Sequence, residues 1–475
     1  MTTLSTDYLV IGAGASGMAF ADELVARSDA EVLLVDRRDR PGGHWLDCYP
    51  FVRLHQASAN YGCNSHPLGA DRIDADGYYE RATGMQIRAY FEQVLDALLT
   101  QGQVRFAGLT DYVGDRSGTH LLTNRITGEC TEVRVRRRVV DTTYLEVKVP
   151  ATHIPSFTVD DDARFIPPGE LPNVAEAPAG FTVLGAGKTA MDTCVWLLRH
   201  GVDPGAICWV RPQEPWICDL RSLQPLAGLP VSMQAMAGWV ECLAAAESVP
   251  DLFARLEATG ALLRLDPTRT PTVFRGPILP AADVELLHSI EQVVRLGRVK
   301  HLGTDRLHLD HGELPTERGR VHVDCTASGF RWAPPVPIWG PDRITLQSLI
   351  GGFTTQYGAL IAYLEATRED DVERNRLCEP VPQVTRDTDW IAMMRGFLRA
   401  GALHADQPDL LDWSDRSRLS FTRGLSAHLD DARLIDALTR WSNAAEPALA
   451  RAELLLAPQR SQLSRAVTED AGGRR

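Results

Sequence analysis

The fold is decided by residues 8–26, which read YLVIGAGASGMAFADELVA. Residues 8–11 form a continuous apolar run, which is typical of a strand buried in a parallel sheet. Three glycines follow with GxGxxG spacing, and residues 18–26 carry a helical pattern. Glycine lets the chain turn tightly and lets the backbone approach a pyrophosphate at a helix N-terminus. We therefore expect this turn to hold a dinucleotide through Gly12, Gly14, Ala15, Ser16 and Gly17.

A second apolar strand is predicted at residues 31–35, and the acidic residue Asp36 follows it directly. In dinucleotide-binding folds, a carboxylate about 20 residues beyond the glycines accepts hydrogen bonds from the ribose hydroxyls. Asp36 lies 24 residues after Gly12, so it is the expected ribose ligand of the first turn.

The same pattern recurs 173 residues further on, where residues 181–184 predict a strand and residues 185–190 read GAGKTA. Residues 191–199 have a helical pattern, and the next predicted strand, at 206–210, is followed by an arginine instead of an acid. The expected binding residues of this second turn are Gly185, Gly187, Lys188, Thr189 and Arg211. A chain that holds two dinucleotides usually moves electrons between them.

Arg211 occupies the place at the ribose that Asp36 has in the first copy. A carboxylate there would repel a 2′-phosphate, whereas a guanidinium binds it with two hydrogen bonds. Arg211 therefore favours NADPH over NADH, and Lys188 adds positive charge near the phosphates. The alternative is that Arg211 is a solvated arginine at the end of a strand.

Size, charge and cysteine content exclude several other classes of protein. With 475 residues, 44% of them hydrophobic, the chain can bury a large core and is expected to form two or three domains. Its net charge of −13 disfavours nucleic acids and anionic membranes as partners. The nine cysteines include no CxxC pair, which argues against a redox dithiol and against a metal site. Because we find no membrane-length apolar run and no secretion signal, we expect a cytoplasmic protein without an integral membrane segment.

Two further segments resemble a known family. Residues 37–45, RRDRPGGHW, resemble the RxGGxW segment of FAD-dependent monooxygenases. Residues 321–330, VHVDCTASGF, resemble the turn by which such flavoproteins pass from their NADPH domain back to their FAD domain. With the two glycine turns, these segments make most of the first 365 residues similar to flavin-containing monooxygenases, which are class B flavoproteins.

The resemblance implies FAD in the first turn and NADPH in the second. It adds Arg37, Gly43, His44, Trp45 and Gly329 to the expected cofactor-binding residues. It also implies a reaction in which NADPH reduces the flavin and molecular oxygen adds to give a C4a-peroxyflavin. One oxygen atom then passes to a small-molecule substrate.

The expected fold class is α/β, with two Rossmann-type dinucleotide-binding domains, a helical insertion and a helical C-terminal region. We expect the first part of the FAD domain at residues 1–165, the NADPH domain at 166–330 with the insertion at about 215–300, the return to the FAD domain at 331–368, and the helical region at 369–475. Within the insertion, residues 282–294 are predicted to form a helix.

Two positions depart from the family pattern. Residues 157–165, FTVDDDARF, lack the glycine and the histidine of the family's linker signature. Ala57 stands about where these enzymes carry an asparagine near the flavin, and Gln56 or Asn60 would be its substitute.

The candidate catalytic residues are His55, Gln56, Arg53 and Asn60. An imidazole and an amide can orient a peroxide or deliver a proton near neutral pH. The alternative is that the histidine and the amides bond to loop backbone and that Arg53 pairs with nearby carboxylates.

Three functions are open on this evidence. The first is an NADPH-dependent FAD monooxygenase that acts on a small molecule. The second keeps both cofactors but is a reductase or oxidase that releases peroxide. The third is a catalytically silent FAD-binding scaffold whose helices engage a partner. Homo-oligomerisation is left open.

Overall fold

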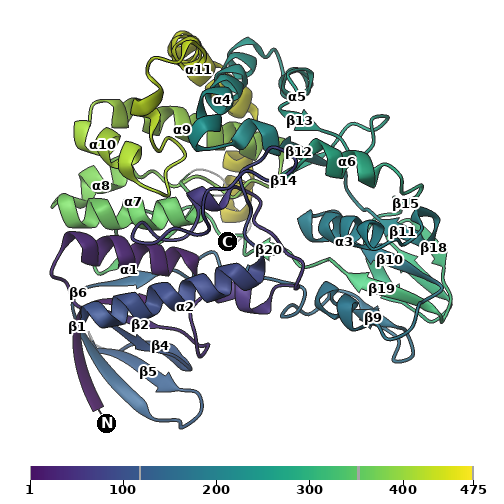
Figure 1. The fold of residues 1–475 in the computed structure, drawn as a ribbon, viewed down its shortest axis with the longest axis horizontal. Helices are drawn as coiled ribbons and strands as arrows, with labels where there is room; N and C mark the ends of the chain where they lie inside the picture. The colour runs from purple at the N-terminus through teal and green to yellow at the C-terminus, as the bar shows by residue number, and fades with distance from the viewer. Residues whose placement is uncertain (1, 117–118, 350–352, 473–475) are drawn as a thin grey trace.

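The computed structural model describes residues 2–116, 119–349 and 353–472. Two separate sheets lie side by side in Figure 1, and a layer of helices covers them from above. The first sheet, in purple and blue, contains the first glycine turn, and the second sheet, in teal and green, contains the second turn. The expected fold class is thereby confirmed.

The first sheet is built around β1 (Thr2–Ile11), which pairs in parallel with β2 (Val32–Val35) and β6 (Cys130–Asp141). Leu9 and Val10 of β1 are fully buried, as the apolar run of the sequence predicts. The remaining strands are β3 (Val104–Ala107), β4 (Thr110–Arg116), β5 (Thr119–Asn124) and β21 (Arg343–Thr345). Their order is β3-β2-β1-β6-β5-β4, and β21 pairs with β6.

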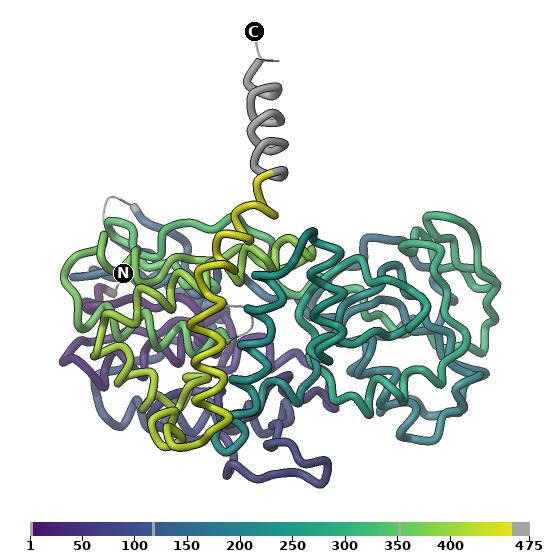
Figure 2. Tube along the Cα trace, turned by 90° about the horizontal axis from the view of Figure 1, so that it is seen from above, coloured from purple at the N-terminus to yellow at the C-terminus, as the bar shows by residue number. Residues whose placement is uncertain are grey.

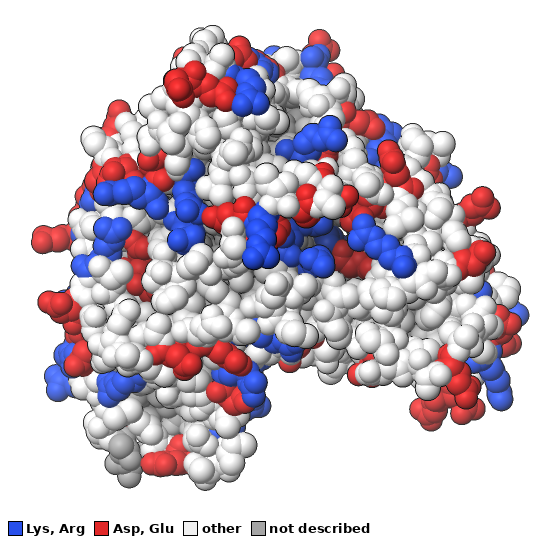
Figure 3. Space-filling model, viewed as in Figure 1, with Lys and Arg blue, Asp and Glu red and all other residues white. Residues whose placement is uncertain are grey.

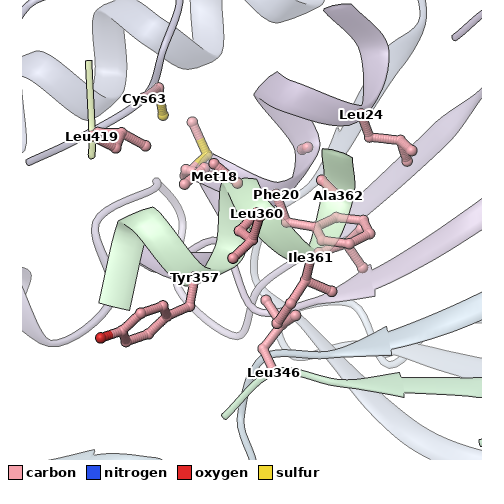
Figure 4. Packing of buried hydrophobic residues seen from close by; sticks show 14 of the residues in the cluster. Met18, Phe20, Leu24, Cys63, Leu346, Tyr357, Leu360, Ile361, Ala362 and Leu419 are labelled. Atoms are coloured by element: carbon pink, nitrogen blue, oxygen red, sulfur yellow. The ribbon is translucent and has the colours of Figure 1, made fainter. Parts of the chain in front are cut away.

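Two helices hold the first glycine turn in place. Helix α1 (Ala15–Arg27) follows the turn, and α7 (Thr354–Thr367) packs against it. Figure 4 shows Met18 and Phe20 of α1 in one apolar cluster with residues of α7. The helices approach closely because residue 358 is a glycine, at which a Cβ atom would lie 2.5 Å from the carbonyl oxygen of Ser16. A third helix, α2 (Gly84–Gln101), completes this core.

The second sheet is entirely parallel, in the order β15-β11-β10-β19-β9. Its strands are β9 (Phe165–Ile166), β10 (Gly180–Leu184), β11 (Ile207–Val210), β15 (Gln292–Val294) and β19 (Arg320–Asp324). Helices α3 (Lys188–Arg199) and α6 (Ala281–Leu287) contact each other and share a core with this sheet. The predicted helix at 282–294 is therefore wrong beyond Leu287, because residues 292–294 form the edge strand β15.

Three smaller sheets accompany the two main ones. A four-stranded sheet beside the second sheet consists of β8 (Thr158–Val159), β16 (Val299–Leu302), β17 (Arg306–Leu309) and β18 (Gly312–Pro315). A three-stranded sheet consists of β12 (Pro215–Asp219), β13 (Leu262–Leu263) and β14 (Val273–Leu279). The pair β7 (Val147–Lys148) and β20 (Gly329–Phe330) joins the two segments that run between the main sheets.

The covering layer combines helices from two distant parts of the chain. They are α4 (Leu229–Ala245), α5 (Val249–Ala258), α8 (Asp371–Leu377), α9 (Asp387–Ala405), α10 (Pro408–Arg416) and α11 (Ala432–Gly472). Figure 2 shows α11, in yellow, running alongside α4, in teal. Leu243, Phe253, Trp390 and Ala448 share one apolar core, so the segment after the second turn folds together with the C-terminal helices.

Glu365 of α7 is the centre of a buried polar network. Its carboxylate accepts hydrogen bonds from the Tyr8 hydroxyl at 2.7 Å and from the Trp339 indole at 2.8 Å, and it forms an ion pair with Arg374 at 3.0 Å. Burial raises the pKa of Tyr8 to about 12, so the phenol stays protonated and donates. The network ties the returning helix to the first strand.

We expect Glu365→Gln to lower the free energy of unfolding by about 3 kcal/mol, because Asp371 must then balance the charges of both Arg374 and Arg138. Urea unfolding at neutral pH measures this change. Glu241→Gln is the matched control, since it breaks an exposed pair with Arg440 that should contribute at most about 1 kcal/mol. Equal losses in the two variants would contradict the importance of the buried network.

Candidate cofactor sites and active site

The first glycine turn has the geometry of a dinucleotide cradle. Gly12 has a φ of +105°, and a Cβ atom there would lie 2.3 Å from the Thr142 hydroxyl oxygen. At Gly17, a Cβ atom would lie 2.1 Å from the carbonyl oxygen of Gly12, so only glycine lets α1 start this close to β1. The first N–H groups of α1 have no partner within the helix and are available to a phosphate.

A cavity of about 370 Å³ opens above this turn. Its walls include eight of the residues predicted for the first cofactor: Gly12, Gly14, Ala15, Ser16, Asp36, Arg37, Gly43 and His44. Phe330 and Gln347, from the segment that returns from the second sheet, close the far side. The walls thus come from the glycine turn, the acidic strand end and the returning chain, which is where the two halves of an FAD would be held.

Asp36 is available to a ribose. One carboxylate oxygen accepts the N–H of Ala13 at 2.7 Å, and the other accepts the N–H of Arg38 at 2.8 Å. Because a carboxylate can accept about four hydrogen bonds, two positions are left for ribose hydroxyls. The neighbouring Arg37 forms an exposed ion pair with Glu146 at 2.6 Å, on the rim of the cavity.

The GGHW segment divides its residues between the cavity and the core. Gly43 has a φ of +57°, and its backbone faces that of Gly14 across the cradle. His44 lines the cavity, and burial lowers its pKa to about 4, so it is neutral at physiological pH. Trp45 points into the core, where its indole donates to the Tyr61 hydroxyl at 2.7 Å.

The second glycine turn repeats the same construction. Gly185 has a φ of +131°, and a Cβ atom there would lie 2.4 Å from the carbonyl oxygen of Cys325. At Gly187, a Cβ atom would meet nothing within 4 Å, so the turn is open on the side where a ligand would lie. The carbonyl oxygen of Thr189, in the first turn of α3, accepts a hydrogen bond from the Thr193 hydroxyl at 2.8 Å. Gly329, with a φ of +74°, lies in β20 beside Lys148.

Arg211 lies next to this turn but is not solvated. Its side chain is 2% exposed, its guanidinium lies 4.8 Å from the centre of the Trp209 ring, and it forms an ion pair with Glu214 at 3.0 Å. The Trp209 indole in turn donates to the carbonyl of Gly185 at 2.7 Å. The arginine is thus fixed beside the second turn by a stack and by a carboxylate.

One loop joins the two turns. The Tyr49 hydroxyl, from the segment after GGHW, donates to Asp192 of α3 at 2.7 Å, and the other oxygen of Asp192 binds the Lys188 ammonium. Phe51 stacks on Trp196 of the same helix at 5.0 Å between ring centres. The loop therefore spans from the first cradle to the helix that begins at the second.

His55 lies four residues after Phe51 in the same loop. Burial is the main cause that lowers its pKa to about 3, and the cations Lys188 and Arg81 lower it further. His44 acts in the same direction, whereas the carboxylate of Asp192 raises the pKa of His55. His55 is consequently a neutral imidazole at physiological pH.

This low pKa predicts a loss of stability in acid. The unfolded chain takes up a proton at His55 below its ordinary pKa of 6.5, whereas the folded protein does not until about pH 3. Stability therefore falls as the pH drops, and His55 should account for about 2 kcal/mol of the loss between pH 6.5 and pH 4.5. We expect the fall in unfolding free energy between pH 6.5 and pH 4.5 to be about 2 kcal/mol smaller in His55→Gln than in the parent protein. Urea unfolding measured across this range tests this. The same loss in both proteins would contradict the assigned pKa.

The other catalytic candidates are bonded to backbone. The Gln56 amide donates to the carbonyl of Asn60 at 2.8 Å, and the Asn60 amide donates to the carbonyl of Ser420 at 2.7 Å. Both side chains are buried in these contacts. Arg53 is exposed and donates to the carbonyl of Arg81 at 3.3 Å. The structure thus turns the two amides toward backbone carbonyls.

Sequence reasoning missed three polar residues at the site. The imidazole of His153, in the linker, lies 2.6 Å from the carboxylate of Asp324, where β19 ends. Tyr49 and Glu214 hold Asp192 and Arg211, respectively. Only His153 could have been found from the sequence, because it lies four residues before the stretch at 157–165 that corresponds to the family's linker signature.

Charge is unevenly distributed over the molecule. Figure 3 shows basic side chains gathered in a band across the middle of the viewed face, with acidic ones among them. In a chain of net charge −13, such a band favours the approach of a ligand that carries phosphates.

The chain matches known proteins in sequence and in fold. Residues 10–76 match the family of NAD(P)-binding Rossmann-like domains. An uncharacterized protein of Mycobacterium tuberculosis strain H37Rv is 39% identical over 429 residues, which cover 89% of this chain and 79% of that protein, and a Mycobacterium bovis protein matches equally well. The chain belongs to the same family as these mycobacterial proteins.

The crystal structure of OTEMO in complex with FAD and NADP is similar in fold, with a TM-score of 0.50 at 14% sequence identity. The match covers 76% of this chain and 85% of that one. It confirms the expected resemblance to two-Rossmann flavoproteins, at the level of the fold.

In the part of the chain that the structure describes, no helix is long and apolar enough to cross a membrane. The described residues also include no group of three or more His, Cys, Asp or Glu that could hold a metal ion.

Proposed function

We propose that the protein is an FAD-dependent NADPH oxidoreductase, and that it acts as a monooxygenase on a small-molecule substrate with molecular oxygen. The fold is that of flavin- and NAD(P)-dependent oxidoreductases. The first cradle fits FAD, because its glycines leave no room for side chains, its acid has free acceptor positions, and its cavity continues to the returning chain. The second cradle fits a nicotinamide dinucleotide, because Gly187 faces open space beside Lys188 and Arg211.

The observation that carries the proposal is the loop between the two cradles. Tyr49 reaches Asp192 of α3 at 2.7 Å, and Phe51 stacks on Trp196 of the same helix at 5.0 Å between ring centres. Cofactors seated in the two cradles would therefore meet over this loop. A protein that only bound FAD would have no need of a bridge from the flavin side to the lysine of a second nucleotide turn.

When bound, the flavin supplies the redox chemistry by accepting a hydride from the nicotinamide and passing electrons to oxygen. The residues of the chain orient the cofactors and shield the reacting atoms from solvent. Asp36 would hold the ribose of the first cofactor, and Lys188 would hold a phosphate of the second. His44 lines the first cavity, and both His44 and His55 are neutral imidazoles, each with one nitrogen that can donate a hydrogen bond and one that can accept a hydrogen bond. A neutral imidazole at His55 can take part in hydrogen bonds, but a pKa of about 3 makes it a weak general base near pH 7.

A reductase or oxidase that releases peroxide is the second candidate. It is favoured by the positions of Gln56 and Asn60, whose amides donate to backbone carbonyls instead of facing the cofactors. The asparagine that the monooxygenase family carries near the flavin thus has no substitute from these two residues in the structure.

One experiment separates the two candidates. The FAD-loaded protein is reduced with NADPH without air and then mixed with isotopically labelled dioxygen and a panel of thioethers and ketones. The monooxygenase proposal predicts a product that carries the labelled oxygen and less peroxide than NADPH consumed. Peroxide equal to the NADPH consumed, with no labelled product, would establish the second candidate instead.

A further inference from the structure

We infer that Glu214 is a specificity-determining residue for the second dinucleotide: it holds Arg211 and Arg295 back from a 2′-phosphate, so that the site accepts NADH as well as NADPH. This inference rests on the proposed function, because it assumes a nicotinamide dinucleotide in the second cradle. It differs from the expectation that Arg211 alone selects NADPH.

The position of Arg211 relative to the glycine turn is fixed by three contacts. The N–H of Gly185 donates to the carbonyl of Val210 at 3.0 Å, so the residue after Val210 begins beside the turn. The Trp209 indole donates to the carbonyl of Gly185 at 2.7 Å, and the Arg211 guanidinium lies 4.8 Å from the centre of the Trp209 ring. In a Rossmann fold, the residue at this strand end faces the ribose of the adenosine.

Glu214 forms ion pairs with both Arg211 and Arg295. Its carboxylate accepts Nε of Arg211 at 3.2 Å and lies 3.0 Å from the second guanidinium nitrogen. The same carboxylate accepts Nε of Arg295 at 2.6 Å. Arg295 also donates to Asp266 at 2.6 Å. Two arginines thus face two carboxylates, and the cluster has no net charge.

A neutral cluster treats the two nucleotides differently from a free arginine. A 2′-phosphate needs guanidinium donors, and it obtains them only by displacing Glu214 from Arg211 or Arg295. The repulsion between the phosphate and the Glu214 carboxylate adds to this penalty. The 2′-hydroxyl of NADH, in contrast, can donate to that carboxylate, as ribose hydroxyls do to acidic residues in NAD-binding sites. Side-chain exposure of 12% for Glu214 and 30% for Arg295 leaves the cluster open to such a ligand.

Glu214→Gln tests the inference, because it keeps the shape of the side chain and removes its charge. Isothermal titration of the FAD-loaded protein with NADP⁺ and with NAD⁺ gives the two dissociation constants directly, without turnover. We expect the preference for NADP⁺ over NAD⁺ to rise roughly tenfold or more, since one charged hydrogen bond changes in each complex. Glu241→Gln is the matched control: it removes a carboxylate that binds Arg440 at 2.6 Å, on α4, and should leave the ratio unchanged.

A second variant tests whether the result comes from a local rearrangement of the cluster. Asp266→Asn removes one of the two carboxylates that bind Arg295 while Glu214 stays in place, so the ratio should move in the same direction by a smaller factor. An unchanged ratio in both variants, with both nucleotides still bound, would overturn the inference and leave the proposed function standing. Failure of the parent protein to bind either nucleotide would overturn both.

Discussion

The variant Gly17→Ala is expected to be purified with far less FAD than the parent protein. Its new methyl group would lie 2.1 Å from the carbonyl oxygen of Gly12, so α1 must move away from β1 to make room. Overpacking of this kind typically costs about 1–3 kcal/mol, which corresponds to roughly tenfold to hundredfold weaker binding if the cost falls on the cradle. The ratio of flavin to protein absorbance, followed by reconstitution with FAD, measures the effect.

Gly401→Ala is the control for this substitution. Residue 401 lies in α9, and a Cβ atom there would meet nothing within 4 Å, so the same chemical change should leave the FAD content intact. Thermal melting of the two apoproteins separates a distorted cradle from a general loss of folding. A Gly17→Ala protein that binds FAD as tightly as the parent would contradict the assignment of the first turn.

Arg211→Ala is expected to weaken the binding of NADPH roughly tenfold or more and to leave that of NADH nearly unchanged. Without the guanidinium, a 2′-phosphate loses its bidentate partner and faces Glu214, whereas the 2′-hydroxyl of NADH never depended on the arginine. The Michaelis constants for the two nucleotides in anaerobic flavin reduction measure the difference.

Because Arg211 is buried against Trp209, its removal also loosens the packing of the second sheet. A variant that weakens the binding of NADPH more than that of NADH isolates the role of the charge, because looser packing would weaken the binding of both nucleotides equally. Arg306→Ala, which removes an exposed arginine paired with Glu313, controls for the change in net charge. Equal effects of Arg211→Ala on NADPH and NADH would refute the role of this residue at the 2′-phosphate.

The parts of the molecule that were predictable from sequence are those set by local chemistry. The strand, the glycine turn and the helix at residues 8–26 depend on neighbours within a few residues, and the structure has β1 ending at Ile11 and α1 beginning at Ala15. The eight predicted residues that line the first cavity follow from the same local pattern together with Asp36 and the GGHW segment.

Features that depend on distant contacts were missed. Residues 292–294 have a sequence compatible with the end of a helix, but they pair with β11 because β-branched valines fit the half-buried edge of the sheet. The bond from Tyr49 to Asp192 joins residues 143 positions apart. Glu214 is only three residues from Arg211, but the irregular loop between them has no pattern that predicts the pairing of the two side chains. The sequence showed an arginine at the ribose position, but not that a carboxylate already holds it.

The central claim is that electrons enter from a nicotinamide dinucleotide in the second cradle and reach a flavin in the first. The most direct test is to mix the purified protein with NADPH in the absence of oxygen and follow the visible absorbance of the flavin. We predict a yellow protein whose absorbance bleaches within seconds or less and returns when air is admitted. A protein that is colourless, takes up no FAD on reconstitution, or stays yellow with both NADPH and NADH would contradict the claim.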